Sequence, residues 1–217
     1  MNSSIIRYIL GNVMRMEACF LLLPCIVSLV YGEGVGLYYL GTAIVCLAFG
    51  VVMAWKKPKN YVFYLKEGCI ATSLSWIVMS LVGCMPFWIS GEIPSFTDAM
   101  FETVSGFTTT GASILTNVEA LSHTALFWRS FTHWIGGMGV LVFLLSGGSN
   151  INLMRAESPG PSVGKLVPKM KYTARILYII YFGMTILEFI FLIIGKMPVF
   201  DSICTAVGTA GTGGFGV

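Results

Sequence analysis

Long apolar runs constrain this chain more than any other feature of its sequence. A helix needs about 20 mainly apolar residues to cross the hydrocarbon core of a bilayer. Five stretches meet this requirement, at residues 8–31, 35–55, 68–89, 125–145 and 174–194. Only 11% of the 217 residues are charged, against 56% that are hydrophobic, which is too few charges to cover a soluble globule. We therefore predict an all-α integral membrane protein with several passes, and the net charge of +3 gives no support to nucleic-acid binding.

Lysine and arginine residues orient the predicted spans. They gather near the first span, between the second and third, and between the fourth and fifth: Arg7, Arg15, Lys56, Lys57, Lys59, Lys66, Arg155, Lys165, Lys169, Lys171 and Arg175. The remaining connections are mainly acidic, with Glu33, Glu92, Asp98, Glu119 and Asp201 against Lys196 alone. Because positive residues mark the cytoplasmic side, we expect the N-terminus to be cytoplasmic. All five spans then fit one alternating topology.

The composition divides the chain into three predicted parts. Residues 1–60 form an N-terminal two-helix membrane domain, and residues 61–157 hold the third and fourth spans. Residues 158–217 begin with a linker rich in proline and glycine, Ser158–Pro168. The six cysteines form no CxxC pair, so we interpret them as small buried hydrophobes rather than a metal site or a disulfide framework. The first apolar run lacks a small-residue cleavage site and is expected to be a retained helix.

The connection between the third and fourth spans, residues 93–122, is too apolar for an ordinary external loop. Ser95 and Asp98 resemble a capping box, so Ala99–Phe107 is expected to form a short helix that reaches halfway through the bilayer. The following Thr108–Ser113 is poor helix material. One interpretation is an extracellular loop with Thr/Ser-rich turns. The other is a re-entrant loop whose carbonyl oxygens replace the hydration shell of a potassium ion.

An internal repeat favours the re-entrant loop. Placing Asp98 on Asp201 pairs, without gaps, Val104 with Val207, Thr109 with Thr212, and Gly111 with Gly214. The repeated unit is a span, a short helix, a glycine-bearing turn and a closing span. The first copy is complete at residues 68–146, whereas the second starts near Ala174 and stops after its turn. We therefore expect either part of a longer protein or a truncated product.

Three segments resemble the Trk/Ktr/HKT superfamily of potassium transporters. They are Phe101–Ser113, Trp128–Gly139, and Phe200–Cys204 together with Thr212–Phe215. The two helices ahead of the first unit are similar to the TrkH-like branch rather than to the shorter KtrB-like branch. The resemblance implies a potassium transporter or channel subunit in which four units surround one ion path, with this chain as its N-terminal part.

The resemblance also implies ligands and partners. Its carbonyl filters correspond here to Thr109, Thr110 and Gly111 in the first loop and to Thr212, Gly213 and Gly214 in the second. Potassium, the transported ion, would bind at Thr109, Thr110, Thr212 and Gly213, and no organic cofactor is expected. The implied partners are the lipid bilayer of the plasma membrane, a second copy in a homodimer, and a cytosolic nucleotide-binding regulatory subunit similar to TrkA. The other filters and the gating element are expected beyond Val217.

A charged residue at membrane depth is usually paired or functional. Arg129 lies near the outer end of the fourth span, and we expect it to support the first loop by pairing with Glu102 or Glu119. The alternative is that its side chain snorkels to the interface. Glu188, in the fifth span, is interpreted as a structural residue that hydrogen-bonds to another helix.

The remaining polar residues do not form an enzyme-like site. A membrane enzyme needs convergent groups on several spans, and His133 and Glu188 with Arg129 show no such constellation, so no enzyme is expected. His123 and His133 are interpreted as helix-packing residues rather than metal ligands. Close helix packing, with a hinge as the alternative, is predicted for Gly136, Gly137 and Gly139. Two functions therefore remain: potassium permeation, or a non-conducting truncated or scaffold subunit.

Overall fold

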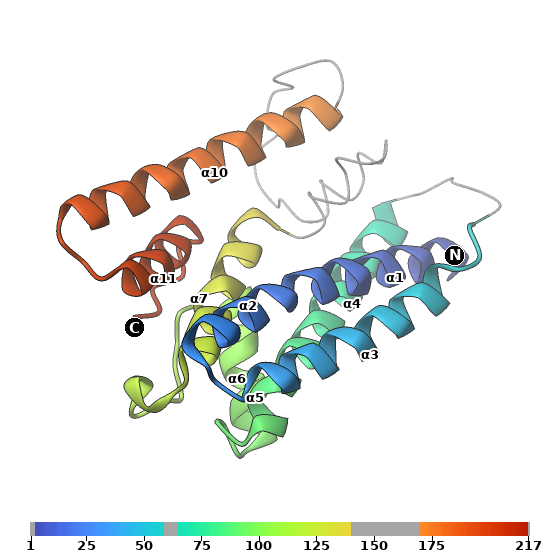
Figure 1. Ribbon diagram of the computed structural model, residues 1–217. Helices are drawn as coiled ribbons and strands as arrows, with labels where there is room; N and C mark the ends of the chain where they lie inside the picture. The colour runs from blue at the N-terminus through green and yellow to red at the C-terminus, as the bar shows by residue number, and fades with distance from the viewer. Residues whose placement is uncertain (1–2, 59–64, 140–169, 217) are drawn as a thin grey trace.

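The computed structural model describes residues 3–58, 65–139 and 170–216, and every regular element in these ranges is helical (Figure 1). The elements are α1 (Ser3–Phe20), α2 (Leu22–Tyr31), α3 (Gly36–Ala54), α4 (Leu65–Gly83), α5 (Met85–Ser90), α6 (Phe96–Phe107), the 3-10 turn η1 (Val118–Ala120), α7 (His123–Met138), α10 (Met170–Ile194) and α11 (Val199–Ala210). The predicted all-α membrane fold is therefore confirmed.

Four helical stretches are long and apolar enough to cross a membrane. They are Ser3–Tyr31, Gly36–Ala54, Glu67–Ser90 and Arg175–Ile194. These stretches coincide with four of the five predicted spans. The remaining span, predicted at residues 125–145, is described only through α7 and Gly139. The rest of that span and the predicted linker Ser158–Pro168 lie outside the described residues.

The first and third spans each consist of two helices, where the apolar pattern predicted one. The break between α1 and α2 lies at Leu21, three residues before Pro24. The break between α4 and α5 lies at Cys84, and Pro86 occupies the first turn of α5. Proline has no amide hydrogen for the helical ladder but is tolerated in a first turn. The apolar run therefore continues through each break while the helix restarts.

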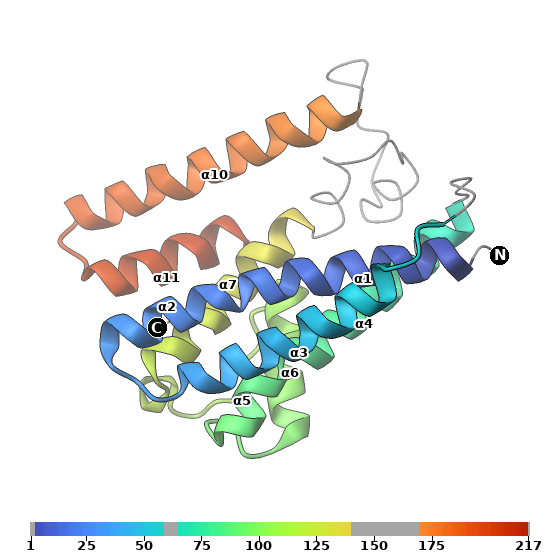
Figure 2. The same ribbon diagram turned by 45° about the vertical axis from the view of Figure 1, so that its right-hand side comes forward.

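Helices α1, α3 and α4 form one packed bundle, which the two views show from different sides (Figure 1, Figure 2). Glycines let α1 and α3 approach closely. A methyl group placed on Gly11 would lie 2.7 Å from the amide nitrogen of Ala54, and one on Gly50 would lie 2.9 Å from the carbonyl oxygen of Gly11. Small residues at helix crossings serve this purpose in membrane proteins.

Helix α7 occupies a central position, because it packs against α2, α6 and α11. Helix α10 lies alongside α11 in both views (Figure 1, Figure 2) and exposes apolar side chains along most of its length. The two short helices, α6 and α11, thus reach the same central helix from units far apart in the sequence. The loops that follow them meet beside α7.

Candidate functional site

The two short helices match in length and position. Helices α6 and α11 each contain 12 residues. When the sequence is aligned so that Asp98 pairs with Asp201, their first residues pair with each other and so do their last. A helix of this length rises about 18 Å, which is well short of the bilayer core of about 30 Å. The predicted short helix begins at Phe96 rather than Ala99, because Ser95 is its N-cap and accepts a hydrogen bond from the amide of Asp98 at 3.4 Å.

The backbone leaves both helices by the same set of three hydrogen bonds. We call Thr108–Ala112 loop 1 and Gly211–Phe215 loop 2. The amides of Thr108, Thr109 and Thr110 donate to Val104, Gly106 and Ser105, at 2.8, 3.0 and 3.0 Å. The amides of Gly211, Thr212 and Gly213 donate to Val207, Thr209 and Gly208, at 3.1, 2.8 and 2.9 Å. The repeat found in the sequence is therefore also a repeat of backbone structure.

Both loops adopt left-handed backbone conformations at equivalent residues. The φ angles are 54° at Thr109 and 57° at Thr212, then 73° at Gly111 and 87° at Gly214. Glycine adopts these angles freely, but for a β-branched residue they are strained. Such strain of about 1–3 kcal/mol persists where the surrounding structure imposes it, often at functional sites.

The strained loops leave their carbonyl oxygens without donors. Within the described part of the chain, no hydrogen bond ends on the carbonyl oxygens of Thr109, Thr110 and Gly111, or of Thr212, Gly213 and Gly214. The hydroxyl of Thr110 lies 2.8 Å from that of Thr108, which in turn donates to Val104. Carbonyl oxygens kept free of donors are suited to a cation, because they are acceptors only.

Loop 1 and loop 2 lie directly against each other. A methyl group placed on Gly111 would collide with the carbonyl oxygen of Gly213. Gly111 therefore has two reasons to be glycine, its positive φ and this contact. Gly214 has only the first reason within the described residues, because a methyl group there would have no atom within 4 Å.

Helix α7 supports both loops through its glycines. A methyl group on Gly136 would collide with the carbonyl oxygen of Phe107, the last residue of α6. One on Gly137 would lie 2.6 Å from the Cα of Gly211, the first residue of loop 2. The close packing predicted for these two glycines is confirmed. Gly139 instead has a φ of 66° at the end of α7, and its carbonyl accepts from the hydroxyl of Tyr178 at 3.2 Å.

A buried ion pair lies within the first unit, between α6 and α7. Nε of Arg129 donates to Oε1 of Glu102 at 2.5 Å, and both side chains are enclosed, with 3% and 0% exposure. Glu102 also accepts from the hydroxyl of Ser113 at 2.9 Å and the amide of Ile114 at 3.0 Å, just beyond loop 1. Of the two partners offered by the sequence, Arg129 contacts Glu102, whereas Glu119 is exposed in η1.

The same arginine reaches loop 2. Its NH1 donates to the carbonyl oxygen of Gly216 at 2.8 Å. Its guanidinium carbon lies 3.6 Å from the centre of the Phe215 ring, a cation–π contact. Snorkelling to the interface is thus not the conformation found. Nothing in the spacing of the sequence indicated that Phe215 or Gly216 would meet Arg129.

His133 lies between the two units. Its Nδ1 is 2.9 Å from the carbonyl oxygen of Gly106, its ring centre is 4.1 Å from that of Phe215, and it abuts the Cα of Gly213. The packing role predicted for His133 is therefore confirmed, although its partners are the end of α6 and loop 2 rather than another span. Nε2 is buried without a hydrogen-bond partner among the described residues.

Other predicted residues lie apart from the loops. Glu188 is half-exposed on α10. No hydrogen bond to it occurs within the described residues, so its bond to another helix stays a prediction. Among the described residues, α10 buries few of its side chains. His123 begins α7, stacks on Tyr31 at 4.0 Å between ring centres, and has Glu33 as its partner at 2.9 Å. No group of three metal-ligating side chains occurs within the described ranges.

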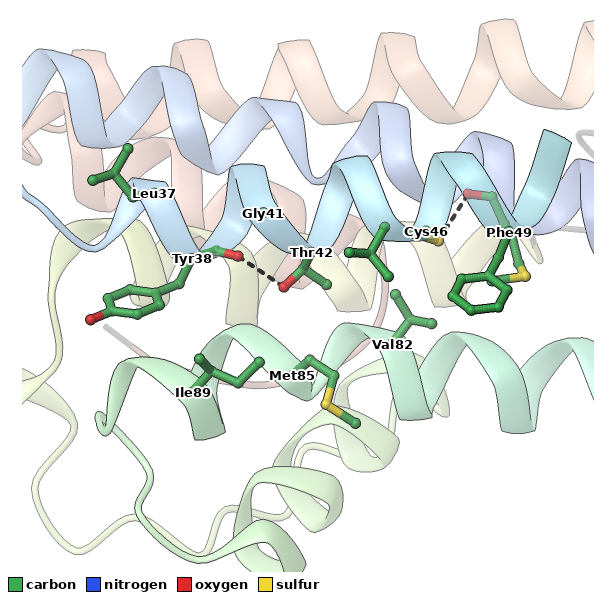
Figure 3. Close-up of a pocket in the computed structure, with 11 residues that line it drawn as sticks. Leu37, Tyr38, Gly41, Thr42, Cys46, Phe49, Val82, Met85 and Ile89 are labelled. Atoms are coloured by element: carbon green, nitrogen blue, oxygen red, sulfur yellow. Dashed lines mark hydrogen bonds between the residues drawn. The ribbon is translucent and has the colours of Figure 1, made fainter. Parts of the chain in front are cut away.

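A separate groove of about 430 Å³ lies between α3 and the α4–α5 segment (Figure 3). Figure 3 shows Leu37, Tyr38 and Thr42 on one side and Met85 and Ile89 on the other. Its lining is almost wholly apolar, and none of the lining residues belongs to loop 1 or loop 2. The groove therefore provides no ligands for a cation.

Comparison with known proteins identifies the family. The family model described as "TrkH: Cation transport protein" matches residues 39–217. The chain belongs to the TrkH family of cation transport proteins. The Trk system potassium uptake protein TrkH of Salmonella typhimurium is 36% identical over 97% of this chain and 45% of its own length. An uncharacterized cation transporter of Methanocaldococcus jannaschii is 33% identical over 98% of this chain and 45% of its own length.

A solved TrkH structure has the same fold. The crystal structure of the potassium transporter TrkH from Vibrio parahaemolyticus superimposes with a TM-score of 0.80 at 29% identity, covering 95% of this chain and 42% of that one. The TrkH-like resemblance found in the sequence is thus confirmed, and the chain spans a little less than half the length of these TrkH relatives.

Proposed function

We propose that potassium ions cross the membrane along a path bordered by loop 1 and loop 2, in a transport subunit with four such units. One observation carries the proposal: the two loops share one strained backbone, and their carbonyl oxygens have no donors within the described residues. The names of the relatives support the choice of ion, because several are potassium uptake proteins. Thr109, Thr110, Gly111, Thr212, Gly213 and Gly214 are the proposed filter residues.

The mechanism needs no covalent chemistry. Carbonyl oxygens of each loop take the place of water around the dehydrated ion, with Thr109, Thr110, Thr212 and Gly213 as the proposed contacts. Helices α6 and α11 end at the two loops, so the negative ends of both helix dipoles point toward the ion. Both loops are re-entrant in this proposal. Non-helical backbone is tolerated at membrane depth where it lines a water-filled path, and the ion path meets that condition.

Glu102 and Arg129 are the proposed supports of this path. Their ion pair ties the segment after loop 1 to α7, and Arg129 continues the connection to Gly216 after loop 2. The transported ions are cations, which an unpaired arginine would repel. Because Glu102 neutralises Arg129, the arginine can hold both loops without repelling the ions. The pair then sets the separation between the loops.

The wider arrangement follows from the same proposal. The distribution of lysine and arginine residues supports a cytoplasmic N-terminus. Residues 1–60 precede the first unit, residues 61–157 form it, and residues 158–217 begin the second. A homodimer in the plasma membrane and a nucleotide-binding regulatory subunit similar to TrkA complete the proposed assembly.

A non-conducting role is the second candidate for the isolated chain, because the chain matches only 45% of the length of its relatives. Complementation of a potassium-uptake-deficient bacterium at limiting potassium separates the two candidates. The strain should receive either this chain or the longest product of its gene. Growth with the longer product supports the proposed path, and failure of this chain alone to restore growth supports a non-conducting role for the isolated chain.

Two glycine substitutions test the filter itself. We expect Gly111→Ala in the longest product to reduce uptake by about tenfold or more, a factor equivalent to about 1.4 kcal/mol. The added methyl group both strains a positive φ and displaces the carbonyl of Gly213. Gly214→Ala is the comparison in the second loop, because among the described residues it adds the strain alone, and we expect it to reduce uptake less. Rates and potassium-to-sodium preference are measured in proteoliposomes, and an unchanged Gly111→Ala variant would refute the filter assignment.

A further inference from the structure

Glu17 is an acidic residue in the middle of a membrane span. It lies fourteen positions after Ser3 and fourteen before Tyr31, the two ends of the first apolar stretch. At about 1.5 Å per residue, it lies about 21 Å from either end. An ionisable residue at this depth is rare and costly. The proposed ion path does not use it, because Glu17 lies in the α1–α3–α4 bundle rather than beside loop 1 or loop 2.

The Glu17 carboxyl is enclosed without a partner. Its exposure is 0%, and neither side-chain oxygen has a hydrogen bond within the described residues. The flanking residues of the same face, Met14 and Ala18, pack with Cys46 of α3 in an apolar cluster. Met53 of α3 and Val78 and Val82 of α4 pack against this cluster. The described neighbours of the carboxyl therefore provide no hydrogen bond to a negative charge.

The charged and titratable groups of the neighbouring elements do not compensate it. From α3 the nearby group is the Cys46 thiol, which donates to the carbonyl oxygen of Met14 at 3.2 Å, and from the α4–α5 junction it is the Cys84 thiol. On α1 itself, Arg15 is exposed and donates to Asn12. Glu67, the acidic residue of α4, lies in its first turn, 15 residues before Val82. Among the described side chains of these helices, no cation pairs with Glu17.

Enclosure also excludes a partner from elsewhere. Because no part of Glu17 is exposed, another chain or a further domain could reach it only after α1 separated from α3 and α4. The apolar groove of Figure 3 reaches Met14 and Cys46, yet Glu17 is not among its lining residues. An unpaired carboxylate in such a medium is far less stable than the neutral acid.

We propose that Glu17 is a proton-binding site, which holds one proton as a neutral carboxylic acid while α1, α3 and α4 are packed together. Release of the proton leaves a carboxylate, so it requires water to enter the bundle and the three helices to separate. The site borders on the contacts of the first short helix, because Gly83, next to Cys84, accepts from the indole of Trp128 at 2.9 Å and abuts Phe107. This inference does not rest on the proposed ion path.

Infrared difference spectroscopy on the longest gene product in lipid nanodiscs tests the proposal. At neutral pH, the spectrum of the wild type minus Glu17→Gln should contain the carbonyl stretch of an un-ionised carboxyl, with the expected shift in heavy water. The control is Glu119→Gln at an exposed position, whose difference spectrum should lack this stretch. Carboxylate bands in the Glu17→Gln difference at neutral pH would overturn the proposal.

A stability measurement accompanies the spectra. If Glu17 is neutral, both Glu17→Gln and the apolar Glu17→Leu should keep the wild-type melting temperature or raise it, because neither removes a paired charge. Glu17→Leu also supplies the difference spectrum if Glu17→Gln does not fold. A marked fall in melting temperature in both variants would show that a partnered carboxylate had been removed, and the proton site would be rejected.

Discussion

At the scale of single residues, Arg129 and Glu102 place two opposite charges in the interior of the protein. Their ion pair is enclosed, and each also bonds to the chain beyond one loop. A buried ion pair contributes little net stability compared with apolar residues, but removing one partner leaves an uncompensated charge and is strongly destabilising. The pair is therefore best understood as a device that fixes position rather than one that adds stability.

Arg129→Gln should lower the free energy of unfolding by about 3–5 kcal/mol, the cost of leaving Glu102 buried without its cation. The double variant Glu102→Gln, Arg129→Gln should recover part of this loss, because no charge remains buried. Melting of the purified protein in detergent measures both. If the single and double variants melted at the same temperature as the wild type, the two side chains would not form the enclosed pair.

At the scale of elements, α7 is the support that both units share. Its glycines admit the end of α6 at Gly136 and the start of loop 2 at Gly137, while His133 fills the space between them. Helices that pack this closely allow backbone, not only side chains, to set the distance between elements. A substitution on this face of α7 should therefore displace the backbone of both loops.

We expect Gly137→Ala to separate α7 from loop 2, because the new Cβ would lie 2.6 Å from the Cα of Gly211 and backbone cannot yield as a side chain can. Potassium uptake by the longest gene product should fall several-fold, with reduced melting temperature. Gly183→Ala on α10 is the matched control, since its Cβ meets no atom within 4 Å and alanine favours a helix by about 1 kcal/mol. Equal effects of the two substitutions would contradict this account.

At the scale of the whole molecule, Glu33 joins the N-terminal helices to the first unit. Its carboxylate accepts from the amides of His123 and Thr124, at 2.8 and 3.0 Å, and from the Thr124 hydroxyl at 2.5 Å. An acidic group at the start of α7 satisfies free amides and complements the helix dipole. Phe200, in the first turn of α11, contacts His123 at 4.9 Å between ring centres.

These contacts predict a dependence of stability on pH. Partial burial raises the pKa of Glu33, but the hydrogen bonds from Thr124 and His123 outweigh it, so the pKa lies below its ordinary value. The stabilisation by Glu33 is therefore complete above the unfolded pKa of about 4.3 and is lost as the pH falls through the lower folded pKa.

Glu33→Gln should remove this dependence. We expect the difference in melting temperature between wild type and Glu33→Gln to be largest at neutral pH and to shrink in acid, as the wild-type carboxylate is protonated. Glu119→Gln, at an exposed position, should show no comparable trend. A difference that stayed constant from neutral to acidic pH would mean that the carboxylate charge does not hold α7.

Local patterns in the chain were sufficient for much of this architecture. Four spans, the Ser95 cap and the two matching loops depend on hydrophobic periodicity and on hydrogen bonds within a few residues, which neighbouring amino acids specify directly. For this reason the pairing of Asp98 with Asp201 predicted equal helices and equal turns. The charge of Arg129 at membrane depth also narrowed its partner to two glutamates.

Packing between distant segments decided the rest. It selected Glu102 over Glu119, brought Arg129 to Gly216, set Gly111 against Gly213, and left Glu17 without a partner. These outcomes depend on how helices cross and how closely their backbones approach. Many residues far apart in the sequence together determine this geometry, and no single local pattern specifies it. A residue's type shows what it can bind, whereas the arrangement of helices around it shows what is within reach.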